Sequence, residues 1–117
     1  MQSDALLELA QTSLEDLKAR DLRVLDVRNL TTVTDYLLIA SGTSDRHVKS
    51  LATQLIDRSK EAGQPPLGVE GQDAGEWVLI DLADVVVHVM QPRVREFYKL
   101  EDLWGVGSDD AAETSAN

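Results

Sequence analysis

Two apolar runs separated by only two residues constrain the fold of this chain most strongly. Residues 77–82 are WVLIDL and residues 85–90 are VVVHVM, with Ala83 and Asp84 between them. Short runs rich in Val and Ile are typical of strands, and a two-residue connection suits a tight antiparallel hairpin. The second run is apolar on both faces, which predicts a central strand buried on both sides of a sheet.

Helical periodicity predicts three helices around these strands. Apolar residues recur at spacings of three and four in residues 3–20, where Ser3 can cap the helix, and again in residues 48–59 before Gly63. Pro92 can open a last helix because proline suits the first helical turn. On one side of that helix the three-and-four rule places Val94, Phe97, Tyr98, Glu101 and Trp104.

Three further segments have the composition of strands. Residues 22–27 and 34–40 are rich in β-branched and aliphatic side chains, and we expect them to pair as a hairpin. Residues 67–70 can form a brief third strand before a connection that contains two glycines. The order helix, strand, strand, helix, strand, strand, strand, helix predicts an α/β (α+β) domain with a single mixed β-sheet flanked by helices.

The composition of the chain is that of one soluble domain. A length of 117 residues suits about one domain, and 43% hydrophobic residues are too many for a wholly disordered chain. No apolar run approaches the roughly 20 residues of a membrane span, and acidic Asp4 and Glu8 do not suit a secretory signal. We therefore expect a cytoplasmic protein with a domain over residues 1–105. Residues 106–117 hold almost nothing to bury, so we expect an acidic, disordered tail there.

The charge and the absence of cysteine argue against several kinds of function. The formal net charge of −10 opposes binding to nucleic acid, which depends on Lys and Arg at the phosphates, and favours basic protein surfaces. We therefore expect no direct binding to DNA. Without cysteine there is no disulfide or thiol catalysis, and with only His47 and His88 a zinc site is poorly supported. No metal and no cofactor are expected.

Large aromatic side chains are concentrated in residues 76–104, which contain both tryptophans and the only phenylalanine. Trp77, Tyr98 and Trp104 each combine an apolar body with a polar group, as residues at protein contacts often do. A partner-binding face and a plain core are equally compatible with these three side chains. The remaining apolar side chains of the segment are assigned to the core, and these are Val85, Val87, Val89, Phe97 and Leu100.

A turn of small residues, IASGTSDRH over residues 39–47, separates a predicted strand from a predicted helix. Such a turn can bind phosphate through backbone N–H groups and the helix dipole. It can also be an ordinary turn in which Ser41, Thr43 or Ser44 caps the helix and Gly42 makes the bend. No GKS or GxGxxG signature accompanies the turn, so the structural interpretation is favoured.

Two carboxylates and a histidine in the predicted hairpin are candidates for chemistry. Asp81 and Asp84 could share a divalent cation or act as acid and base, but Asp81 could equally cap the connection or pair with Arg93 or Arg95. The DxD-like pair of a nucleotidyl-transfer enzyme is missing. His88 alternates with valine and methionine along a strand, so we interpret it as a core or half-buried histidine satisfied by one hydrogen bond.

Three motifs in order carry a resemblance to a known family. ASGTSDRHVKSLA at residues 40–52, EWVLIDLADVVVHVM at residues 76–90 and REFYKLEDLWG at residues 95–105 closely resemble the Iojap family of ribosomal silencing factors, also called RsfS. The resemblance covers about residues 5–105. It implies a domain similar to nucleotidyltransferases that lacks their catalytic carboxylates, and therefore a protein that is not an enzyme.

The resemblance also implies a function and a partner. Family members bind the large ribosomal subunit through large-subunit ribosomal protein fourteen at the intersubunit face, block joining of the small subunit when nutrients are scarce, and tend to form homodimers. One alternative function is that of a nucleotide-binding or nucleotidyl-transfer enzyme. Another is that of a general RNA-associated assembly factor, with a basic patch at Arg93, Arg95 and Lys99. The partner surface implied here comprises Trp77, Asp81, Asp84, His88, Arg95, Tyr98, Glu101 and Trp104.

Overall fold

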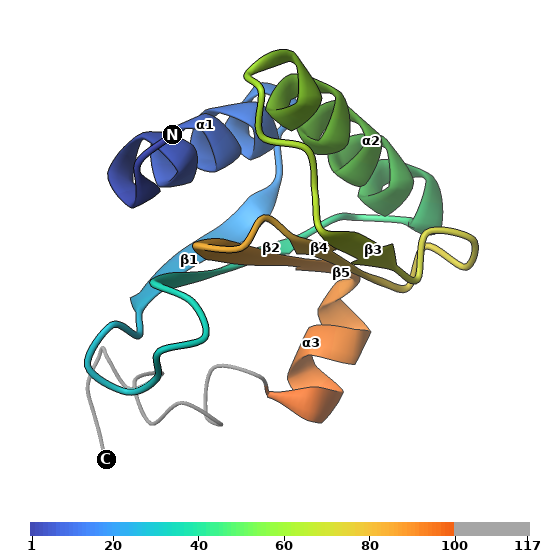
Figure 1. Cartoon of the computed structure of the whole chain (residues 1–117). Coiled ribbons are helices and arrows are strands. Elements are labelled where there is room, and N and C mark those ends of the chain that lie inside the picture. The colour runs from blue at the N-terminus through green and yellow to red at the C-terminus, as the bar shows by residue number, and fades with distance from the viewer. Residues whose placement is uncertain (100–117) are drawn as a thin grey trace.

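Five strands form one mixed sheet in the order β1-β2-β5-β4-β3, and this computed structural model describes residues 1–99 of the chain (Figure 1). The order of helices and strands is the predicted one, which confirms the α/β class. The elements are α1 (Ser3–Asp16), β1 (Arg20–Asp26), β2 (Tyr36–Ser41), α2 (Asp45–Glu61), β3 (Gly68–Glu70), β4 (Trp77–Asp81), β5 (Val85–Met90) and α3 (Pro92–Tyr98).

Strand β5 lies at the centre of the sheet, as its apolar faces predict. It pairs in parallel with β2 and antiparallel with β4, so the predicted hairpin is confirmed. The predicted antiparallel pairing of β1 with β2 is also confirmed, while β3 lies at the other edge against β4. Val85, Val87 and Val89 are fully buried because they face the two long helices.

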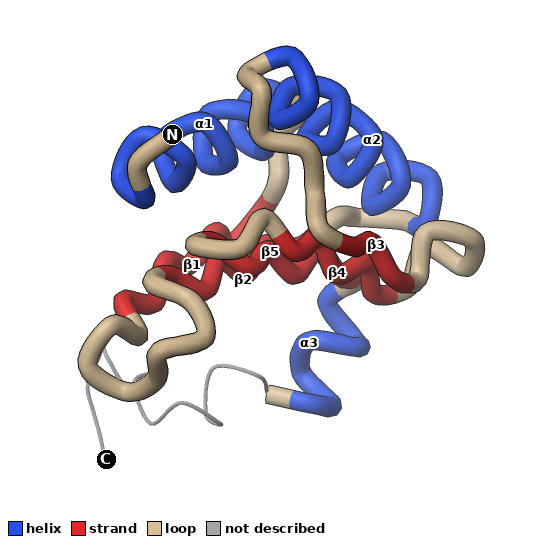
Figure 2. The backbone as a smooth tube through the Cα atoms, in the orientation of Figure 1, coloured by secondary structure: helices blue, strands red, loops and turns tan. Residues whose placement is uncertain are grey.

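Helices α1 and α2 cover one face of the sheet, and α3 projects from the opposite face (Figures 1 and 2). The core under the long helices combines the apolar stripes of both with the facing strand residues. A second apolar cluster lies on the other face, which we call the α3 side of the sheet. Its buried members are Leu25, Val27, Leu37, Ile39, Met90 and Val94, with Trp77 and Val86 packed against them.

The start and end of α1 differ from the prediction. Gln2 rather than Ser3 is the N-terminal cap, because the hydroxyl of Ser3 donates a hydrogen bond to the carboxylate of Asp35 in the loop before β2. The helix ends at Asp16 instead of continuing to residue 20, since Lys18 has a left-handed backbone with φ of 61°. Leu17 therefore packs against the core from a turn.

Helix α3 is shorter than the sequence pattern predicts, and one of its side chains that was predicted to be buried is exposed. It ends at Tyr98 because Lys99 adopts a left-handed backbone with φ of 49°. Phe97, predicted to be in the core, is 80% exposed. The helix contacts the sheet near Val94 and then leads away from it, so one turn later there is no sheet to cover the ring (Figure 1). Leu100, Glu101, Trp104 and the predicted tail lie outside the described residues.

Within residues 1–99, no helix is both long and apolar enough to cross a membrane.

Candidate protein interface

Three aromatic side chains lie together where β4 meets α3, and we call Trp77, Phe97 and Tyr98 the aromatic patch. The ring centroids of Trp77 and Tyr98 are 4.9 Å apart at a tilt of 47°. Those of Phe97 and Tyr98 are 5.0 Å apart in an edge-to-face arrangement, which is favourable for aromatic pairs. Because Tyr98 is 53% exposed and Phe97 still more so, the patch is open to a partner.

His88 supports the aromatic patch from the neighbouring strand. The indole Nε1–H of Trp77 donates a 3.0 Å hydrogen bond to Nδ1 of His88, and the two ring centroids are 5.9 Å apart. His88 is only 8% exposed, and burial lowers its pKa to about 4. The imidazole is therefore neutral near pH 7, which confirms the interpretation of a buried histidine with one hydrogen bond.

A groove of about 430 Å³ runs along the aromatic patch. At its edge Arg93 and Glu76 form an ion pair with an N–O distance of 3.0 Å, and both side chains are mostly exposed. Exposed pairs of this kind contribute little to stability, so the pair can rearrange at small cost. The groove is lined by Glu76, Trp77, Arg93, Val94, Phe97 and Tyr98.

Arg95 holds α3 in place against the strand ends. Its Nη1 donates to the backbone carbonyl of Asp21 at 2.5 Å and to Oγ of Ser41 at 3.0 Å. At the start of the helix, Nε2 of Gln91 donates to the carbonyl of Gly75 at 3.2 Å. The pattern of residue types does not reveal this role for Arg95, because its contacts lie 74 and 54 residues away in the chain.

Asp81 and Asp84 lie at the opposite end of the hairpin from the aromatic patch. In the hairpin Trp77 is paired with Met90, and Asp81 is paired with Val86. Asp81 is four residues after Trp77 along β4, so the two residues are separated by roughly 13 Å. Oδ1 of Asp81 accepts a 2.9 Å hydrogen bond from the backbone N–H of Ala83, so it caps the connection as one of the two predicted alternatives requires. In the part of the chain that the structure describes, no three His, Asp or Glu side chains group as metal ligands.

The turn before α2 is capped internally. Oγ of Ser44 accepts from the N–H of His47 at 3.1 Å, which identifies Ser44 as the cap. The N–H of Thr43 donates to Nδ1 of His47 at 2.9 Å, and that of Gly42 donates to the carbonyl of Met90 at 3.0 Å. The N–H groups of Gly42, Thr43 and His47 are thus occupied within the turn, which supports its structural interpretation.

His47 also joins the two long helices, a role that the sequence does not reveal. Its Nε2 lies 2.7 Å from the carbonyl oxygen of Leu17, and because Nδ1 accepts a hydrogen bond, Nε2 is the donor.

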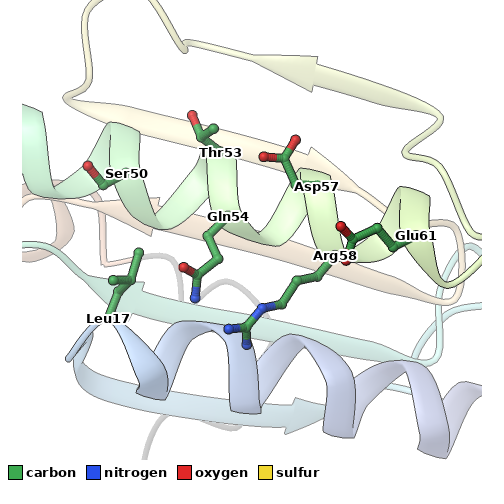
Figure 3. Close-up of a pocket in the computed structure, with 7 residues that line it drawn as sticks. All are labelled: Leu17, Ser50, Thr53, Gln54, Asp57, Arg58 and Glu61. Atoms are coloured by element: carbon green, nitrogen blue, oxygen red, sulfur yellow. The ribbon is translucent and has the colours of Figure 1, made fainter.

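A second groove, between α1 and α2, is lined by polar side chains that hold the helices together (Figure 3). Gln54 and Arg58 point toward α1, where Gln54 donates to the carbonyl of Ser13 at 3.2 Å and Arg58 pairs with Asp16 at 2.7 Å. These contacts give the groove a structural role. The lining consists of Leu17, Ser50, Thr53, Gln54, Asp57, Arg58 and Glu61.

Fold and surface together define a small α/β domain that exposes an aromatic patch beside its sheet. The sequence model of the family described as "Ribosomal silencing factor during starvation" (RsfS) matches residues 1–117. The ribosomal silencing factor RsfS of Chromobacterium violaceum is 46% identical over 90% of this chain and 86% of its own length. The chain belongs to the RsfS family.

A solved structure and a mitochondrial relative extend this result. A crystal structure of a Chromobacterium violaceum protein superposes with a TM-score of 0.88 at 46% identity, covering 90% of this chain and 88% of the other. The mouse protein named "Mitochondrial assembly of ribosomal large subunit protein 1" is 36% identical and is matched over 92% of this chain and 51% of its own length. The resemblance noted from the three motifs is therefore confirmed, and so is the fold.

Proposed function

We propose that this protein represses translation in the cytoplasm by binding the large ribosomal subunit and preventing the small subunit from joining it during nutrient limitation. Membership of the ribosomal silencing family supports this proposal. The name of the mouse relative, which refers to the ribosomal large subunit, supports the choice of subunit. Steric blocking needs only a stable contact at the intersubunit face and no chemical step.

The aromatic patch is the proposed contact with large-subunit ribosomal protein fourteen. Phe97 and Tyr98 are exposed beside Trp77, and this is the observation that carries the proposal. Large aromatic side chains contribute much of the binding energy at protein interfaces, especially when they are held rigidly. The hydrogen bond from Trp77 to His88 fixes the indole ring before the partner arrives.

The other predicted interface residues have different proposed roles. His88 and Arg95 position the patch, because one supports Trp77 and the other holds α3. Asp81 and Asp84 belong to a separate acidic part of the surface at the far end of the hairpin. Glu101 and Trp104 stay proposed contacts that lie outside the described residues.

The charge of the chain supports a protein partner rather than bare RNA. A net charge of −10 attracts basic ribosomal proteins and is repelled by the phosphates of ribosomal RNA. Docking should therefore be faster and tighter at low salt, since complementary charges mainly accelerate association. Binding to the isolated ribosomal protein should persist without RNA.

Sedimentation of ribosomal subunits with and without this protein tests the function. We expect the protein to migrate with the large subunit and to reduce the amount of joined ribosomes. The Trp77→Ala variant should lose both effects, whereas Leu67→Ala, which alters an exposed side chain near β3, should keep them. Normal subunit joining at saturating wild-type protein would disprove the proposal.

A binding experiment with purified ribosomal protein fourteen tests the partner. We expect capture of the isolated protein, weakened by added salt, and a homodimer of the free silencing factor in analytical ultracentrifugation. If capture requires ribosomal RNA and the isolated protein does not bind, the proposed partner is wrong.

A further inference from the structure

Exposed apolar side chains gather at two places on the α3 side of the sheet. One is the aromatic patch, with Phe97 and Tyr98. The other is the loop over residues 27–35 between β1 and β2, where Val33 is 81% exposed and Leu30 is 54% exposed. These two places hold four of the large apolar side chains that are exposed within residues 1–99. The full set is Met1, Val24, Leu30, Val33, Leu67, Phe97 and Tyr98.

The loop over residues 27–35 bends to the same side of the sheet as α3 (Figures 1 and 2). Its first residue, Val27, is fully buried in the apolar cluster that also contains Val94 of α3. At its other end, the backbone N–H groups of Asp35 and Tyr36 donate to the carbonyl of Asp84 at 2.9 and 3.1 Å. The loop therefore lies beside the acidic end of the β4–β5 hairpin.

Internal hydrogen bonds hold the loop in one shape. The N–H of Leu30 donates to the carbonyl of Val27 at 2.9 Å, and the N–H of Val33 donates to Oγ1 of Thr31 at 3.1 Å. The N–H of Val27 donates to the carbonyl of Asp35 at 3.0 Å and so closes the loop at its base. An ordered loop that displays apolar side chains loses little conformational entropy when a partner covers them.

We infer that Leu30 and Val33 form a second contact for the protein that docks on the aromatic patch. This inference rests on the proposed function and extends its interface across the α3 side of the sheet. The two apolar sites flank a surface with Val86 and Asp81, paired across β5 and β4, and with exposed Asp84. A basic protein surface with apolar side chains at both ends complements this arrangement in charge and in polarity.

A double variant, Leu30→Ser with Val33→Ser, tests the second contact. We expect its affinity for purified large subunits to fall by about tenfold or more, because two exposed anchors are lost. Leu67→Ser is the matched control, since Leu67 is 75% exposed near the opposite edge of the sheet and should bind as the wild type does. Val33→Ser alone removes a side chain too exposed to affect folding and should weaken binding in the same direction.

Two results would overturn the inference while leaving the proposed function intact. One is wild-type affinity of the double variant under conditions in which Trp77→Ala no longer binds. The other is a double variant that loses only self-association in analytical ultracentrifugation, which would assign the loop to contact between two copies of this chain. Failure of the wild-type protein to bind large subunits would instead disprove the proposed function, and the second contact with it.

Discussion

The indole N–H of Trp77 donates a hydrogen bond to Nδ1 of His88 and so joins the start of β4 to the middle of β5. This bond needs a neutral imidazole whose Nδ1 carries no proton. Burial keeps His88 neutral by lowering its pKa to about 4 from 6.5. The support under the aromatic patch is therefore sensitive to acid.

The free energy of unfolding should decrease as the pH falls, because the unfolded chain protonates His88 more readily than the folded protein does. Because the folded-state pKa of about 4 is below the ordinary value of 6.5, the unfolded chain binds more protons between these pH values. The His88 contribution is complete above about pH 6.5 and is lost as the pH falls to about 4, a change of roughly 3 kcal/mol. Urea unfolding of the wild-type and His88→Phe proteins at several pH values in this range measures the prediction. The free energy of unfolding should decrease more steeply with falling pH in the wild type than in the variant. The same pH dependence in both proteins would contradict a buried, neutral His88.

Truncation of Phe97 should separate binding from stability. Phe97→Ala removes a mostly exposed ring, so the free energy of unfolding should change by about 0.5 kcal/mol or less while affinity for large subunits falls about tenfold. Val94→Ala is the control on the same helix, because Val94 is buried. This variant should lose about 1–3 kcal/mol of the free energy of unfolding. A marked loss of stability in Phe97→Ala would mean that the ring is part of the core.

Replacing Ser13 should stabilise the protein. The Oγ of Ser13 is buried and, among the described side chains, stands out as a polar atom without a hydrogen-bond partner. Ser13→Ala removes this unsatisfied group and should raise the free energy of unfolding by about 1 kcal/mol in urea denaturation. Ser59 is the matched control, since its hydroxyl donates to the carbonyl of Ile56 at 2.9 Å. Ser59→Ala should therefore lower stability, and a gain in both variants would point to helix propensity alone.

Gly71 should tolerate no side chain. Its φ is +85°, and a Cβ would lie 2.1 Å from the carbonyl oxygen of Trp77, so Gly71→Ala should lower the melting temperature strongly. Gly63 has a similar φ of +80° but open space around it, and Gly63→Ala should cost only about 1–2 kcal/mol of backbone strain. Equal losses in the two variants would show that the clash with Trp77 has no effect.

Local patterns were enough to predict most elements of this fold. The run at residues 85–90 coincides with β5, and the two-residue connection made the β4–β5 hairpin evident. Motifs in three segments identified the family. The predictions for Ser3 and for the end of the last helix failed, because Ser3 bonds to Asp35 in another segment and Lys99 takes a left-handed backbone that periodicity does not signal.

The candidate site could be predicted only in part. The density of aromatic residues pointed to the segment that contains the aromatic patch, and within it the rings of Trp77 and Tyr98 are in contact. Arg95 and His88 carry the same residue types that a surface contact would have, yet they bond inward to Asp21 and Trp77. The exposure of Leu30 and Val33 could not be predicted, because isolated apolar residues in a predicted loop give no signal of exposure.

Hydrophobic periodicity and turn chemistry act over a few residues, so the types and order of the elements follow from the sequence directly. It also determined the family. Tertiary structure alone decided that β2 pairs in parallel with β5, and that Phe97 is exposed while Val94 is buried. Exposure depends on which surface faces a side chain, and the position of that surface results from packing between segments far apart in the chain.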